Sequence, residues 1–145
     1  MTKHLKPRHI LVGVLALAFI LWLTVPGRPM FSPPSSQLSK DYAIGVALSI
    51  SKATNGTVII ARGESMLPYL GERSIHVSSP ADFDLLEGGQ IVTYKDENGD
   101  LVLHVLIRRI GDEWTARGYN SRWDDPIRVN RENLHGLVHT TIHHR

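Results

Sequence analysis

The chain has 145 residues, enough for one compact domain and an appendage, and it has no cysteine for a disulfide framework, a thiolate nucleophile or a cysteine-based zinc site. Its formal net charge is +2, but residues 1–40 hold five basic side chains and no acidic one, which leaves eleven basic against fourteen acidic side chains in the rest, a formal −3. Such a mildly acidic folded part argues against a nucleic-acid-binding face.

An uncharged, almost wholly apolar run occupies residues 10–25 and follows the basic residues Lys3, Lys6 and Arg8. As a helix, its sixteen residues would rise about 24 Å, slightly less than the roughly 30 Å core of a bilayer. We therefore predict a single-pass anchor within residues 1–27, in contact with membrane lipid, with its N-terminus in the cytoplasm and the rest of the chain on the outer side of the plasma (inner) membrane. A cleaved secretory signal is the alternative, but no small-x-small cleavage site follows the run.

A predicted spacer and a predicted helix follow the anchor. Residues 28–39 are rich in proline and serine, which predicts an extended spacer before a folded domain over residues 40–145. Residues 38–54 alternate like a strand, but a helix capped by Ser39 and ended at Asn55 fits their length better. Such a helix could also lie on a bilayer surface, although it has few charges for that role.

Downstream, short runs rich in β-branched residues are separated by turn signals, which predicts a mainly β, antiparallel domain. The dipeptide Asn98-Gly99 between two apolar runs is a strong hairpin signal and makes the segment from Val102 the return strand. The predicted strands cover residues 57–61, 74–77, 90–94, 101–110, 113–117 and 137–142.

Three kinds of polar side chain carry a chemical hypothesis. Ser65 lies where the segment GESMLP interrupts the β pattern, and a serine hydroxyl needs a positioned base to become an effective nucleophile. His104, within a predicted strand, is the leading candidate for that base. Asp124 and Asp125, in a turn-like segment, supply carboxylates to orient the imidazole. Taken singly, these residues are more often a turn serine, a structural histidine and a turn cap.

The ordered set of segments resembles one known family. GESMLP is similar to the G-x-S-M-x-P box of the signal peptidases and of their relatives, the LexA-type self-cleaving repressors. GGQIVTY resembles the family's G-D-I-V-x-F strand, LVLHVLIRRIGDEWTARGYN its H-R-V strand and T-x-G-D-N turn, and VNRENLHGLV its closing V-x-x-E-x-I-x-G-x-V strand. The resemblance covers roughly residues 57–142 and implies an antiparallel, β-rich catalytic domain of the signal peptidase/LexA-like type.

The resemblance implies a membrane-anchored serine endopeptidase that needs no cofactor and cleaves signal peptides or a dedicated exported preprotein or peptide. Ser65 would be the nucleophile, and His104 would be the base in place of the lysine of most bacterial members. Asp125 would be the catalytic aspartate, with Asp124 beside it. An extended substrate would pair with exposed strands by β-augmentation.

Four positions are implied to support the site or to bind substrate: Gly63, Met66, Pro68 and Asp124. The resemblance also implies that Met66 and Leu67 lie close to a membrane-facing rim.

The chain also departs from the family pattern. Tyr119 replaces the acidic residue of the G-D-N turn, Val105 replaces the arginine after the histidine, and Gln90 replaces the aspartate before the I-V strand. Gly63 replaces a hydroxyl residue that is often found two positions before the nucleophile. Backbone N–H groups, including that of Ser65, would then have to stabilise the oxyanion.

Other functions remain open. If the changes at Tyr119 and Val105 silence the chemistry, the protein is a membrane-tethered peptide-binding module of the same fold. A self-cleaving repressor is disfavoured by the apolar N-terminus, the histidine base and the lack of a DNA-binding region in the sequence. His135, His139 and His143 would share one face of a helix and suggest a metal site, but neighbouring β-branched residues favour a strand, so no metal is expected.

Overall fold

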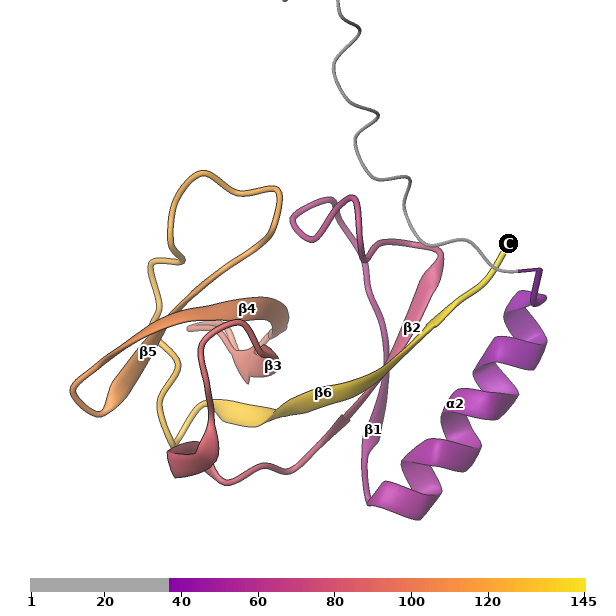
Figure 1. Ribbon diagram of the computed structural model, residues 1–145, viewed down its shortest axis with the longest axis horizontal. Coiled ribbons are helices and arrows are strands. Elements are labelled where there is room, and N and C mark those ends of the chain that lie inside the picture. Colours follow the sequence, from indigo (N-terminus) through magenta and orange to yellow (C-terminus); the bar gives the residue numbers. More distant parts are fainter. Residues whose placement is uncertain (1–36) are drawn as a thin grey trace, which may run out of the picture. The chain divides into compact units, whose positions relative to one another are not determined.

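The computed structural model describes residues 37–145, which form one antiparallel six-stranded sheet and one α-helix (Figure 1). This confirms the prediction of a mainly β, antiparallel fold. The predicted anchor, residues 10–25, and most of the spacer lie outside the described residues. Within residues 37–145, no helix combines the length and the apolar character needed to cross a bilayer.

The helix α2, Lys40–Thr54, begins and ends where the sequence predicts. The hydroxyl of Ser39 accepts a hydrogen bond from the backbone N–H of Tyr42, and Asn55 adopts the left-handed conformation that ends many helices. Ala43 and Ala47 lie one turn apart, are fully buried and pack against β2, because small side chains allow the helix to approach the sheet closely. The strand interpretation of this segment is therefore wrong.

The sheet has the strand order β1-β2-β6-β3-β4-β5, so β1 and β5 are its edges. All six predicted strands are present, most of them within one or two residues of the predicted limits. Their bounds are β1 Thr57–Ile60, β2 Ser74–Ser79, β3 Ile91–Lys95, β4 Leu101–Ile110, β5 Glu113–Arg117 and β6 Leu134–His143, and a short 3₁₀ turn, η1, covers Phe83–Leu85.

Two connections place the strands that matter for the site. The β3–β4 hairpin closes at Gly99, whose φ of +83° suits glycine, and this confirms the hairpin prediction. The long strand β6 pairs with β2 along most of its length and with β3 near its start, so it joins the two halves of the sheet (Figure 1).

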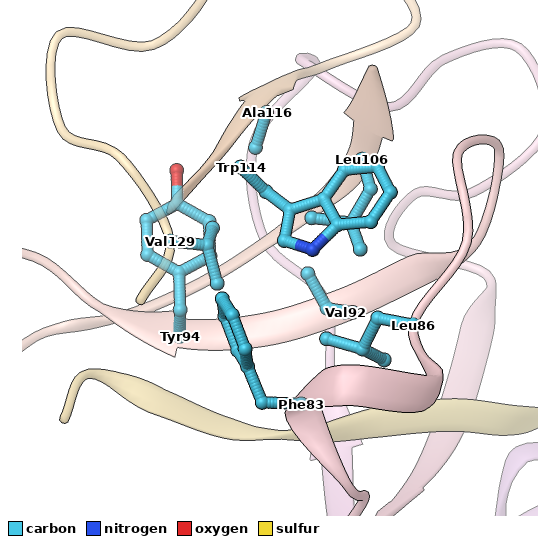
Figure 2. Packing of buried hydrophobic residues seen from close by; sticks show 8 residues of the cluster. All are labelled: Phe83, Leu86, Val92, Tyr94, Leu106, Trp114, Ala116 and Val129. Atoms are coloured by element: carbon cyan, nitrogen blue, oxygen red, sulfur yellow. The ribbon is translucent and has the colours of Figure 1, made fainter. Parts of the chain in front are cut away.

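The larger hydrophobic core lies around β3, β4 and β5. Figure 2 shows its eight buried members together, with the ring of Tyr94 among them and the tyrosine hydroxyl at the end remote from Phe83. Tyr94 is 1% exposed, so its ring contributes to the core while its hydroxyl must find a polar partner. The buried members are Phe83, Leu86, Val92, Tyr94, Leu106, Trp114, Ala116 and Val129.

Candidate active site

Ser65 lies in the loop that follows the edge strand β1. Gly63 in this loop has a φ of +88°, a conformation that side chains other than glycine rarely adopt. Asn120 makes two hydrogen bonds to this loop. Its backbone N–H donates to the carbonyl oxygen of Ser65 at 2.7 Å, and its side-chain amide donates to the carbonyl oxygen of Glu64 at 3.1 Å. The position of the candidate nucleophile is therefore fixed by the segment that follows β5.

His104 lies in the middle of β4 and contacts both of its predicted partners. Its Nε2 is 2.9 Å from Oγ of Ser65, and its Nδ1 is 2.7 Å from Oδ2 of Asp125. The side chains of His104 and Asp125 are only 13% and 14% exposed, so water screens the pair weakly. The structure thus brings Ser65, His104 and Asp125 into one continuous hydrogen-bonded chain.

The chemistry of the aspartate determines the tautomer of the histidine. An ionised carboxylate only accepts hydrogen bonds, so Nδ1 of His104 carries the proton that is donated to Asp125. In the neutral imidazole, Nε2 then presents its lone pair to the hydroxyl of Ser65. This is the arrangement that a general base for serine requires.

The two neighbouring aspartates have different partners. The backbone N–H of Asp125 donates to the carbonyl oxygen of Ala116 at 2.8 Å, which attaches this residue to β5 with its carboxylate at His104. Asp124 instead lies 3.8 Å from Arg117, in a partly exposed ion pair. The structure therefore brings Asp125 to the histidine and leaves Asp124 outside the hydrogen-bonded chain.

Tyr94 was not identified from the sequence, although it belongs to the strand GGQIVTY. Its hydroxyl donates to Oδ2 of Asp125 at 2.6 Å. Burial and the adjacent negative charge of Asp125 raise the pKa of Tyr94, so the phenol keeps its proton and acts as the donor. A tyrosine where the resembling strand has phenylalanine was the available signal.

A small apolar cluster packs against the nucleophile loop, residues 61–73 between β1 and β2. Met66, Leu70 and Val105 are each about 5% exposed or less and contact one another. Met66 is buried between the loop and β4, whereas the next residue, Leu67, is 37% exposed. Pro68 lies between Met66 and Leu70 in the loop, and the peptide bond that precedes it is cis.

Gly118 is the second residue that the sequence did not single out. A methyl group at this position would overlap the carbonyl oxygen of Ser65 and would lie 3.0 Å from Nε2 of His104. The close packing of the Gly118 backbone against both side chains leaves no room for a larger residue. The position corresponds to the glycine of the T-x-G-D-N turn, so the motif contained the signal.

An open groove of about 440 Å³ leads to Ser65 and His104. Residues 59–63 line it on the β1 side and residues 101–104 on the β4 side. In the part of the chain that the structure describes, β1 pairs only with β2, and β4 is paired over residues 101–104 only with β3. Both strands therefore have an unpaired edge, and such an edge can accept an extended peptide.

Tyr119, which replaces the acidic residue of the resembling turn, makes an aromatic contact. Its ring stacks edge-on against Tyr69 with 5.1 Å between the ring centroids, and both rings are partly exposed. Tyr119 therefore links the nucleophile loop to the turn that carries Gly118 and Asn120.

The histidines near the C-terminus lie in or beside a strand, as predicted. His135 contacts the hydroxyl of Thr57 in β1, His139 contacts that of Ser79 in the neighbouring strand β2, and His143 ends β6. Among residues 37–145, no three histidine, aspartate or glutamate side chains gather in a way that suits a metal ion.

A scan against models of protein families finds no family that matches the chain, and a search of curated proteins finds no significant relative.

Proposed function

We propose that the protein is a membrane-anchored serine endopeptidase of the signal peptidase type, acting on an exported preprotein or peptide. The observation that carries this proposal is the hydrogen-bonded chain from Ser65 through His104 to Asp125, with bonds of 2.9 and 2.7 Å. These residues come from three separate segments, and Ser65 and His104 also line a groove. A turn serine and a structural histidine would not be expected to combine these features. The finer assignment to a signal peptidase/LexA-like fold rests on the order of the motifs.

In the proposed reaction, Oγ of Ser65 attacks the scissile carbonyl carbon while Nε2 of His104 takes the hydroxyl proton. Asp125 stabilises the imidazolium through Nδ1, and the imidazolium then protonates the departing amine. Water hydrolyses the resulting acyl-enzyme with His104 again as base. Backbone N–H groups, including that of Ser65, are the proposed donors to the oxyanion, because Gly63 has no side chain to offer.

The groove supports an extended peptide as the substrate. A peptide that lies between residues 59–63 and residues 101–104 would add main-chain hydrogen bonds to the free edges of β1 and β4. Most of the lining side chains are apolar, which suits a substrate with apolar or small side chains near the scissile bond. The apolar run at residues 10–25 supports an anchor that would concentrate the enzyme beside a membrane-bound substrate.

The test is cleavage of a preprotein or an Ala-x-Ala peptide by the full-length protein in detergent. Ser65→Ala and His104→Ala should each lower kcat/KM by at least about 10³-fold, because nucleophile and base act as one unit. Ser49→Ala on the exposed face of α2 and His135→Ala on β6 remove the same side-chain types from positions that do not line the groove, and these variants should cleave normally.

Undiminished cleavage by either site variant would rule out this mechanism. If the native protein binds the peptide but cleaves no member of a broad peptide library, the peptide-binding module replaces the enzyme. Mass spectrometry of the mature N-terminus tests separately whether the anchor is retained.

A further inference from the structure

Two hydrogen-bond donors converge on a single oxygen of Asp125. Oδ2 accepts from Nδ1 of His104 at 2.7 Å and from the hydroxyl of Tyr94 at 2.6 Å. Both distances are short, as expected when the acceptor is ionised. Tyr94 itself is almost fully buried, and its ring is held by the surrounding core (Figure 2).

The rigidity of Tyr94 gives this contact its significance. The main chain of Asp125 lies in an irregular segment after β5 and is attached by the bond from its backbone N–H to Ala116. That bond leaves the carboxylate free to rotate about its side-chain torsions. A phenol on the central strand β3 restricts this rotation, because its position is set by core packing and not by the loop.

We propose that Tyr94 is a positioning residue for the peptidase chemistry: it holds the carboxylate of Asp125 against His104, so that the imidazole keeps the tautomer and orientation that Ser65 needs. The inference rests on the proposed function. It adds a fourth, buried member to the site, one that touches neither the substrate nor the reacting atoms.

Tyr94→Phe tests this directly, because the ring and its packing remain and only the hydroxyl is lost. We expect kcat to fall about 10-fold with KM nearly unchanged, which corresponds to the loss of one hydrogen bond to a charged group. Thr93→Val is the matched control: it removes the neighbouring buried hydroxyl on β3, which bonds to Ser78 and Gly136, and should lower stability without changing kcat.

Coupling to Asp125 separates positioning from general support of the fold. In an Asp125→Asn background, Tyr94→Phe should change kcat less than about twofold, because the group through which it acts is already altered. An equal, additive loss in both backgrounds would overturn the proposal. So would a Tyr94→Phe enzyme with native kcat.

A measurement that needs no turnover distinguishes failure of this inference from failure of the proposed function. In NMR spectra of the full-length protein in detergent micelles, the proton on Nδ1 of His104 should resonate far downfield, and Tyr94→Phe should shift it and speed its exchange with water. Thr93→Val should leave it unchanged. If the native protein cleaves no peptide, the proposed function fails and this resonance still decides whether Tyr94 positions the pair; an unchanged resonance in Tyr94→Phe overturns the inference.

Discussion

Replacing Gly118 with alanine perturbs the candidate site by a single methyl group. A β-carbon at this position would overlap the carbonyl oxygen of Ser65, and it would lie 2.9 Å from Cβ of Ser65 and 3.0 Å from Nε2 of His104. The φ of Gly118 is not positive, so alanine meets no backbone penalty there. The effect of the substitution is therefore steric and falls on Ser65 and His104 without changing either residue.

The size of the effect follows from these distances. To reach an ordinary contact, Cβ of Ser65 must retreat by about 0.5 Å, and its carbonyl oxygen must move further, although Asn120 holds that oxygen at 2.7 Å. A misplacement approaching 1 Å costs on the order of 10²-fold in rate, so kcat/KM should fall about 100-fold. The crowding should also lower the free energy of unfolding by about 1–3 kcal/mol.

The assay compares peptide cleavage and urea unfolding of Gly118→Ala with those of Gly45→Ala. At Gly45, in α2, a methyl group meets no atom within 4 Å, so alanine should raise the free energy of unfolding by about 0.5–1 kcal/mol and leave turnover unchanged. If Gly118→Ala cleaves and unfolds like the native protein, the described contact between Gly118, Ser65 and His104 is wrong.

Two further predictions follow from other contacts. Asp125→Asn should lower kcat by about 10⁴-fold whereas Asp124→Asn should change it by less than about threefold, because only the first carboxylate contacts the histidine; a kinetic ranking in the opposite order would transfer the orienting role to Asp124. Burial, reinforced by His143, lowers the pKa of His76 from 6.5 to about 4, so the folded state resists its protonation and the free energy of unfolding should fall by about 3 kcal/mol as the pH falls from above 6.5 to about 4. Urea titrations across this range should show that His76→Gln removes that part of the pH dependence, and an equal pH dependence in both proteins would contradict it.

The fold was largely predictable because its elements are local. Ser39 and Asn55 carry cap chemistry, and Asn98-Gly99 carries turn chemistry, so each determines the conformation of its own neighbourhood. The ends of β6 were less predictable: the strand begins at Leu134, three residues before the predicted start, because pairing with Tyr94 of β3 extends it. Long-range pairing of this kind leaves little trace in local sequence.

The residues of the candidate site also fall into two groups, those that the sequence identified and those that it did not. Ser65, His104 and Asp125 were identified because motif order places residues of known chemistry at fixed spacings. Tyr94 and Gly118 were not, since one reads as an apolar core residue and the other as a turn glycine. Their roles depend on which atoms they meet across the sheet, and only the tertiary structure gives that information.

Val105, which departs most plainly from the family pattern beside the base, has a physical reason in this chain. The alternation of side chains along β4 directs His104 to Ser65 and Asp125, and directs Val105 to the opposite face, where it packs with Met66 and Leu70. Val105 is 5% exposed, so an arginine in this environment would bury an unpaired charge at a high cost. One strand thus fixes the base with one side chain and supports the nucleophile loop with the next, and the departure at Val105 is consistent with the proposed chemistry because the hydrogen-bonded chain does not pass through it.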